Sequence, residues 1–160
     1  MPANATRDTT TEAIAWALLS VARAMNQVKA HDWLCKQAGV DLDRGGAALL
    51  YKLYSEGDDV RPTDLAERLG IDSPAVTRKV QQLERAGLLR RAPDPEDARA
   101  LRLRLTDAGR SSIERLFRAR EDRLEELLAK WSRCDLEEFA RLLQLFASTL
   151  AGEGEEHDAS

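Results

Sequence analysis

The hydrophobic positions of this chain follow a helical spacing over most of its length. The first such stripe consists of Ile14, Leu18, Val21, Met25 and Val28. Because a helix returns to the same face every three or four residues, this spacing predicts one long first helix. After a stretch over residues 31–38, further apolar stripes predict helices over residues 44–55, 62–69 and 73–86. A glycine stands after each of them, so the first half of the chain is predicted to be a series of helices joined by short turns.

Residues suited to helix starts stand at the predicted boundaries. Thr9 and Asp135 are each followed three positions later by Glu, which is the spacing of a capping box, and they predict the starts of the first and last helices. Single N-cap residues are predicted for three further helices and are Asp43, Ser73 and Thr106. The helix after Thr106 is predicted to be long, with an apolar stripe that reaches Trp131.

The pattern changes to a period of two in the middle of the chain. Residues 88–92 are a short strand candidate, and residues 100–105 alternate leucine with arginine. The Pro-Asp-Pro-Glu-Asp segment between them is typical of a turn, so the two strands are predicted to form a hairpin with an exposed tip. Val60 could add a third, very short strand.

Two helices joined by a tight turn and followed by a hairpin form the pattern of a winged helix-turn-helix. The predicted fold class is therefore mainly α, with a winged helix-turn-helix lobe over 43–105 that includes a small antiparallel β-hairpin wing. N- and C-terminal helices over 11–38 and 106–150 flank this lobe, and the last helix has a broader apolar stripe than one small lobe requires, which predicts a dimerisation region there. Residues 1–10 and the acidic tail 151–160 are predicted to be disordered.

The second helix of the pair would enter the major groove of DNA with its N-terminal half at the bases. The predicted DNA contacts on this helix are Ser73, Thr77, Arg78, Lys79 and Gln82, and Arg91 of the hairpin joins them. These residue types suit the task, since arginine pairs with guanine edges, glutamine with adenine, and hydroxyls with phosphates.

The charge of the chain is unevenly distributed. The net charge of −4 argues weakly against binding to nucleic acid. Residues 76–105, however, contain eight basic and four acidic side chains, a local charge of +4. Because salt screens charges beyond about 8 Å, we give this local charge more weight than the total.

Four stretches of the sequence resemble the multiple-antibiotic-resistance regulator (MarR) family. They are PTDLAERLGI (62–71), SPAVTRKVQQLERAGLLRR (73–91), DPEDAR (94–99) and LTDAG (105–109), within a resemblance over about 12–150. The resemblance implies a homodimer with intertwined first and last helices that binds a pseudo-palindromic operator, here expected to act as a repressor. It also implies that Arg99 of the wing tip enters the minor groove, and that Asp97 pairs with a nearby arginine to hold the wing in shape.

The resemblance further implies that a small, often phenolic or aromatic, effector can release the DNA. The candidate effector-binding residues are Trp16, His31, Trp33 and Tyr51, which lie on the elements that would line such a cleft. Ordinary packing is the alternative for each of them. His31 and Cys35 share a helical face, but a tetrahedral metal site needs about four ligands, so neither a metal nor a cofactor is predicted.

Other functional classes are less well supported. Two histidines, two cysteines and no glycine-rich phosphate loop leave little catalytic chemistry, so no enzyme is predicted. The absence of a long apolar segment or signal peptide predicts a cytoplasmic protein with reduced thiols at Cys35 and Cys134. A constitutive DNA-binding regulator without a ligand and a helical protein-interaction module stay open as alternatives.

Overall fold

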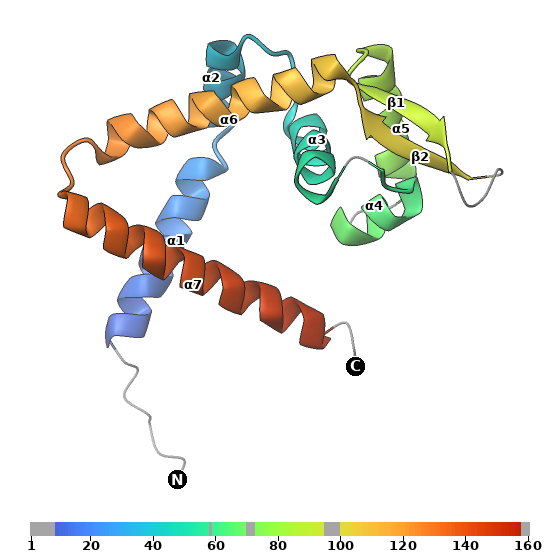
Figure 1. The fold of residues 1–160 in the computed structure, drawn as a ribbon. Helices are drawn as coiled ribbons and strands as arrows, with labels where there is room; N and C mark the ends of the chain where they lie inside the picture. Colours follow the sequence, from blue (N-terminus) through green and yellow to red (C-terminus); the bar gives the residue numbers. More distant parts are fainter. Residues whose placement is uncertain (1–8, 58, 70–72, 95–99, 158–160) are drawn as a thin grey trace. The chain divides into compact units, whose positions relative to one another are not determined.

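The computed structural model describes residues 9–57, 59–69, 73–94 and 100–157. Within these ranges seven helices and one two-stranded sheet follow one another along the chain (Figure 1). The helices are α1 (Thr9–Met25), α2 (Val28–Ala38), α3 (Arg44–Glu56), α4 (Pro62–Leu69), α5 (Ser73–Arg85), α6 (Asp107–Leu128) and α7 (Arg133–His157), and the strands are β1 (Leu89–Pro93) and β2 (Leu101–Leu105). The fold is mainly helical with a small hairpin, as predicted. The chain forms two compact units, Met1–Arg120 and Glu121–Ser160.

The core of the first unit lies where α3 meets α5 and the hairpin, with α4 packed against α5 and β2, near the start of α6 (Figure 1). Its fully buried side chains are Leu49, Leu50 and Leu53 of α3, Leu65 of α4, Val76 and Val80 of α5, and Leu103 of β2. They are the apolar positions of the predicted stripes. Burying each one contributes about 1.5–3 kcal/mol, which holds α4, α5 and the hairpin as one lobe.

The two strands pair in antiparallel register, with Leu89 opposite Leu105. Val60 forms an isolated bridge with Leu103, donating its N–H at 3.4 Å and accepting at 2.8 Å. Both the hairpin and the very short third strand are therefore confirmed. Because side chains alternate across a strand, Leu103 and Leu105 face the core, while Arg102 and Arg104 lie half-exposed on the other face.

A close junction joins the hairpin to α6. Thr106 Oγ1 accepts from the Gly109 N–H at 3.0 Å and so caps α6, as predicted. The same hydroxyl donates to the Gly87 carbonyl at 2.6 Å, and the Thr106 N–H donates to the Leu88 carbonyl at 3.1 Å. A Cβ atom at Gly109 would lie only 2.0 Å from the Leu88 oxygen. Only glycine therefore fits at this point of α6.

The first helix is shorter than predicted. Helix α1 ends at Met25, and Val28, which we assigned to it, instead begins α2. Gln27 separates the two helices with an extended backbone (φ −67°, ψ 131°). Periodicity does not reveal this break because Met25 and Val28 keep a helical spacing across it. Asn26, whose short polar side chain is unfavourable inside helices, precedes the break.

The connection between the last two helices also differs from the prediction. Helix α6 ends at Leu128, so Trp131 lies in the connection and not on the long helix. The N-cap of α7 is Ser132 rather than Asp135, since Ser132 Oγ accepts from the Asp135 N–H at 3.2 Å. Asp135 sits in the first turn and accepts from the same hydroxyl at 2.6 Å. Aspartate in the first turn also favours a helix start, which explains the displaced prediction.

The predicted disorder at the ends is partly wrong. Helix α1 already includes Thr9 and Thr10, and α7 continues beyond residue 150 to His157. Extending an existing helix needs no new nucleation, and alanine and glutamate are good helix formers, so the acidic segment 151–157 can follow α7. Residues 1–8 and 158–160, for which disorder was also predicted, lie outside the described residues.

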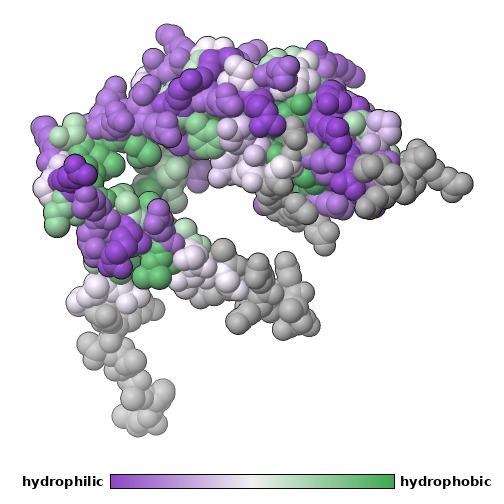
Figure 2. Space-filling model, viewed as in Figure 1, coloured by the Kyte–Doolittle hydropathy of each residue, from purple (hydrophilic) through white to green (hydrophobic). Residues whose placement is uncertain are grey.

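Helices α1 and α7 each carry large exposed hydrophobic side chains, which reach the surface in Figure 2. On α1 they are Ile14, Trp16, Leu18, Leu19, Val21 and Met25, and on α7 they are Phe139, Leu142, Leu143, Leu145, Phe146 and Leu150. The structure of the described residues leaves these apolar side chains exposed on both helices. Among the helices of the described ranges, none is long and apolar enough to cross a membrane.

Candidate nucleic-acid interface

Helix α5 has two contrasting faces. Val76, Val80 and Leu83 recur at helical spacing and are buried against the core. Thr77, Arg78 and Gln82 lie exposed on the opposite face, together with Gln81 and Arg85. Ser73 is the first residue of the helix. The structure therefore brings Thr77, Arg78 and Gln82 onto one polar face, with Lys79 at its edge, while the side chain of Ser73 lies outside the described part of the chain.

Lys79 is held by two acceptors. Its ammonium pairs with the carboxylate of Asp43, and it donates to Gln82 Oε1 at 2.9 Å. Asp43 is also the N-cap of α3, because its Oδ1 accepts from the Gly46 N–H at 2.8 Å, as predicted. The hydrogen bond from Lys79 holds the pKa of Asp43 below its ordinary value. Lys79 thus joins α5 to the start of α3.

Arg91 lies beside the end of α5. Its Nε is 3.1 Å and 3.2 Å from the two carboxylate oxygens of Glu84. This contact links β1 to α5 and partly neutralises a side chain that we predicted to contact DNA. The wing-tip residues Asp97 and Arg99 lie outside the described residues, so their predicted roles stay predictions.

A buried carboxylate anchors the base of the wing, and sequence reasoning missed it. Asp94 follows β1 and its side chain has no exposed area. Its Oδ2 lies 2.8 Å from Arg61 Nε and 2.9 Å from Arg102 Nε. Its N–H donates to the Ala100 carbonyl at 3.1 Å, across the hairpin loop. The pairing raises the pKa of Arg61. The sequence did contain a signal for this ion pair, because Asp94 directly follows β1 and the paired strand β2 carries Arg102.

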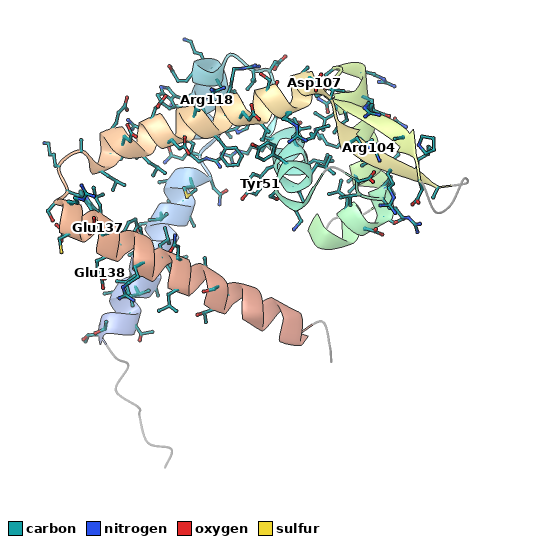
Figure 3. The ribbon with its side chains drawn as sticks, in the orientation of Figure 1. Tyr51, Arg104, Asp107, Arg118, Glu137 and Glu138 are labelled. Carbon is teal, nitrogen blue, oxygen red and sulfur yellow. The ribbon has the colours of Figure 1, made fainter. Side chains whose placement is uncertain are left out.

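The second arginine of β2 is also paired. Arg104 donates to both oxygens of Asp59, at 2.9 Å and 3.0 Å, and this lowers the pKa of Asp59 (Figure 3 labels Arg104). Arg102 donates to the Asp59 carbonyl at 3.2 Å. The hairpin arginines therefore serve partly to hold the wing, and the charge count over residues 76–105 overstates what faces outward.

Three other exposed arginines near α5 and the hairpin are not paired in this way within the described residues. For Arg78, Arg85 and Arg90, the described part of the chain places no carboxylate within ion-pair distance. Arg78 and Arg85 belong to the exposed face of α5, and Arg90 to β1. Positive charge that is not balanced by a neighbouring carboxylate is what attracts a phosphate backbone.

The four candidate effector residues have different surroundings. His31 Nε2 lies 2.8 Å from the Leu42 carbonyl, while the Tyr51 ring packs 5.4 Å from that of Phe117 (Figure 3 labels Tyr51). Trp16 is exposed on α1, and Trp33 is partly exposed on α2. His31 thus contacts a backbone carbonyl and Tyr51 contacts an aromatic ring, so their effector role stays a prediction.

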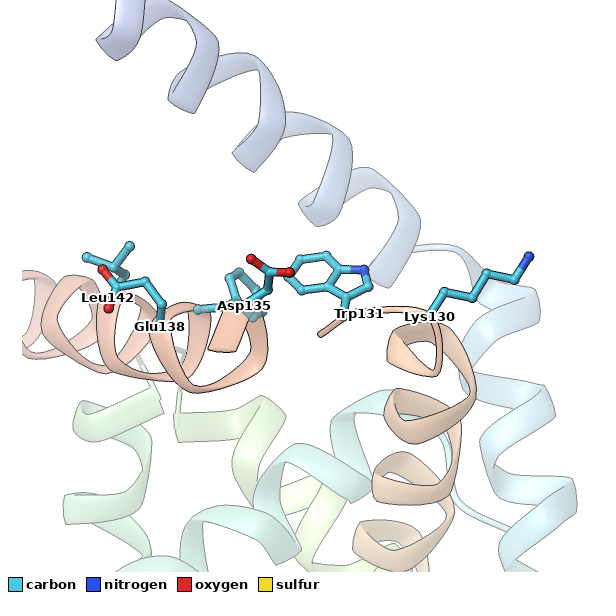
Figure 4. Close-up of a pocket in the computed structure, with 6 residues that line it drawn as sticks. Lys130, Trp131, Asp135, Glu138 and Leu142 are labelled. Carbon is cyan, nitrogen blue, oxygen red and sulfur yellow. The ribbon is translucent and has the colours of Figure 1, made fainter. Parts of the chain in front are cut away.

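A described pocket of about 520 Å³ lies in the second unit, at the start of α7 (Figure 4). Its lining residues are Lys130, Trp131, Asp135, Glu138, Phe139 and Leu142. The rings of Trp131 and Phe139 meet edge to face, 5.3 Å apart. None of the predicted effector residues belongs to this pocket.

The cysteines and acidic residues offer little reactive chemistry. Cys35 is buried, and its burial raises the pKa of the thiol, which favours the unreactive protonated form. Cys134 is a free, exposed thiol. In the described ranges no three histidine, cysteine or acidic side chains are grouped as metal ligands.

Comparison with known sequences gives consistent relatives. The model of the MarR family matches residues 44–101. The HTH-type transcriptional regulator YxaD of Bacillus subtilis is 32% identical over 104 residues, which cover 65% of this chain and 72% of YxaD. The HTH-type regulator YdgJ of the same organism is 38% identical over 96 residues, and the match spans 60% of this chain and 58% of YdgJ.

Solved structures share the fold. A MarR family protein from Bacillus stearothermophilus superposes with a TM-score of 0.81 at 21% identity, over 92% of this chain and 99% of its own. The structure of Staphylococcus aureus MepR in complex with DNA gives a TM-score of 0.62 at 22% identity, over 85% of this chain and 98% of its own.

The family consists of transcriptional regulators, which confirms that this chain is not an enzyme. Helices α4 and α5 form the helix-turn-helix, and β1 and β2 form its wing. The chain belongs to the MarR family of winged helix-turn-helix transcriptional regulators.

Proposed function

We propose that this protein is a homodimeric repressor that binds a pseudo-palindromic operator in double-stranded DNA. The observation that carries the proposal is the polar face of α5, where Thr77, Arg78 and Gln82 lie exposed opposite a buried apolar face. A helix held in this way presents one ordered row of side chains to the major groove. The fold that this chain shares with DNA-bound MepR supports the same docking.

The side chains on this face would divide the work of recognition. Arg78 carries an extended donor group that suits the acceptors of guanine, while Thr77 suits a phosphate. Arg99 remains the proposed minor-groove contact, since narrow minor grooves concentrate negative potential and attract arginine. The anchoring of the hairpin by Asp94 would let the wing hold that contact in a fixed place.

Dimerisation is supported by the apolar faces of α1 and α7. Each helix exposes a run of large hydrophobic side chains, which are unfavourable in water. A second copy would cover them and would place two α5 helices about one turn of DNA, about 10 base pairs, apart. A two-fold symmetric protein then requires a two-fold symmetric operator.

The test combines assembly and binding. Sedimentation of the full chain should give a dimer at micromolar concentration. Selection from random double-stranded DNA should yield a sequence with inverted half-sites, and binding to it should weaken steeply with salt. A monomer, or a protein without salt-sensitive attraction to any selected duplex, would overturn the proposal.

Repression and effector release complete the proposal. A dimer bound across a promoter would block transcription, and its target DNA places its action in the cytoplasm. A small aromatic acid near Trp16, His31, Trp33 or Tyr51 would release the operator. A thermal-shift screen of aromatic acids, followed by operator titration with each stabilising compound, checks this part. A screen without stabilisation or release would leave a constitutive regulator instead.

A further inference from the structure

One carboxylate outside α5 pairs with a side chain of that helix. Asp43 lies at the start of α3, 36 residues before Lys79, yet its carboxylate pairs with the Lys79 ammonium. The lysine side chain also packs closely against the backbone of Gly45. A Cβ atom at Gly45 would lie only 3.2 Å from Lys79 Cε. With 22% of its side chain exposed, Lys79 is mostly covered.

The position of this ammonium is unusual for a cation. It lies at the N-terminus of α3, where the helix dipole is positive and repels positive charge. The Asp43 carboxylate offsets that repulsion while it caps the helix through the Gly46 N–H. Lys79 is therefore held at this place by Asp43, and the loss of that charge would turn an attractive environment into a repulsive one.

The ammonium in turn fixes the orientation of an amide. Lys79 donates to Gln82 at 2.9 Å, and an ammonium has only donors, so the amide oxygen of Gln82 must face it. The NH₂ group of Gln82 then points away from Lys79. A glutamine that reads adenine in bidentate fashion needs both its oxygen and its NH₂ at the base. Held by Lys79, Gln82 offers chiefly a donor.

We propose that Asp43 is a positioning residue for base recognition, which acts through Lys79 to make Gln82 a donor to a base acceptor. The acceptor would be guanine O6 or N7, adenine N7, or thymine O4. In this role Lys79 joins α5 to the start of α3 and is not itself a phosphate contact. This inference rests on the proposed DNA-binding function and assigns new roles to Asp43, Lys79 and Gln82 within it.

The first experiment separates the charge of Asp43 from its capping role. Asp43→Asn keeps a side-chain oxygen that caps a helix equally well, but it removes the ion pair. Released Lys79 should then reach the phosphates and steepen the salt dependence of operator binding by about one unit of slope per protomer. Discrimination at one symmetric base pair of each half-site should fall about fivefold.

Three further variants separate the role of the Asp43 charge from that of Lys79. Asp41→Asn removes the same charge from an exposed position two residues earlier and should leave binding unchanged. Lys79→Met should weaken discrimination at the same base pair without changing the salt slope. The double variant Asp43→Asn with Lys79→Met should return the slope to the wild-type value, because no ammonium is released. A shallower slope for Lys79→Met alone would make Lys79 a phosphate contact and overturn the inference.

The orientation of Gln82 has its own test. Gln82→Glu keeps the oxygen that faces Lys79 but replaces the outward donor with an acceptor, so preference at that base pair should be lost. Gln81→Glu adds the same charge on the same exposed face and should lower affinity without changing that preference. The side-chain amide resonance of Gln82 in the free protein should shift in Asp43→Asn and not in Asp41→Asn.

The outcomes distinguish this inference from the function beneath it. A wild-type protein without salt-sensitive DNA binding would overturn the proposed function and the inference together. Wild-type binding to a selected operator, with the salt slope and base preference of Asp43→Asn unchanged, would overturn the inference alone.

Discussion

A Cβ atom at Gly109 would stand 2.0 Å from the carbonyl oxygen of Leu88, which is far inside the contact distance of the two atoms. The start of α6 therefore touches the backbone that enters β1. Thr106 closes the same junction with hydrogen bonds to both sides. The Leu-Thr-Asp-Ala-Gly segment thus has a physical reason for both its threonine and its glycine.

Replacement of Gly109 should destabilise the fold. Gly109→Ala would force α6 away from Leu88, and overpacking of this kind typically costs about 1–3 kcal/mol of unfolding free energy. The control is Gly152→Ala, also in a helix, where a Cβ atom has no neighbour within 4 Å and alanine should be neutral or slightly stabilising. Urea denaturation measures both, and equal midpoints for the two variants would contradict the close contact.

The wing should depend on its buried carboxylate. Asp94→Asn removes the charge that pairs with Arg61 and Arg102, and we expect a loss of about 1–3 kcal/mol in unfolding free energy, since the two arginines are only partly covered. Operator affinity should fall as well, because the hairpin loses its anchor. Asp59→Asn breaks the more exposed pair with Arg104 and should have a smaller effect in the same denaturation and binding assays.

Arg78 should contribute base preference rather than general attraction. Arg78→Ala should weaken operator binding by about 1–3 kcal/mol and relax the preference at one base pair of each half-site. Arg118→Ala removes the same charge from the exposed surface of α6 and should leave both properties unchanged (Figure 3 labels Arg118). Fluorescence anisotropy at constant salt measures the affinities. An equal loss on every DNA sequence would make Arg78 a phosphate contact.

The pair between Asp43 and Lys79 should make stability sensitive to acid. The pKa of Asp43 is lower in the folded protein than its ordinary value of 3.8, mainly because Lys79 donates to it. The folded state therefore binds this proton less readily than the unfolded chain does. The pair contributes its full stability above the ordinary pKa and loses it as the pH falls towards the folded value.

Asp43→Asn should remove this part of the pH dependence. The difference in urea midpoint between the wild type and Asp43→Asn should be largest near neutral pH and shrink below about pH 4. The effect should be modest, because 54% of the Asp43 side chain is exposed. A difference that stays constant from pH 6 to pH 3 would show that the ion pair between Asp43 and Lys79 does not stabilise the fold.

Local sequence signals predicted much of the fold. The N-caps at Asp43 and Thr106 and the bridge at Val60 follow from residue types and periodicity, which act over a few positions. The break before Val28 did not follow, because its apolar spacing continues across it. The cap at Ser132 was missed because Asp135 offers a similar signal three residues later.

The sequence predicted which residues share the exposed face of α5, but it did not predict the ion pairs that hold them. The exposed row on α5 follows from helical spacing, since burial of Val76 fixes where Arg78 must point. The pairing of Lys79 with Asp43 and of Asp94 with Arg61 joins residues more than 30 positions apart. Such contacts depend on how the helices and strands pack, so no local sequence pattern predicts them.

The paired arginines of the hairpin have a consequence for how the protein would search a chromosome. Non-specific binding to DNA grows with the number of condensed counterions that a protein displaces. Arg102 and Arg104 already neutralise Asp94 and Asp59, so they displace fewer. Random genomic sequence, which vastly outnumbers any operator, would then compete weakly for the protein. Occupancy of the operator would rest mainly on the bases that the protein reads.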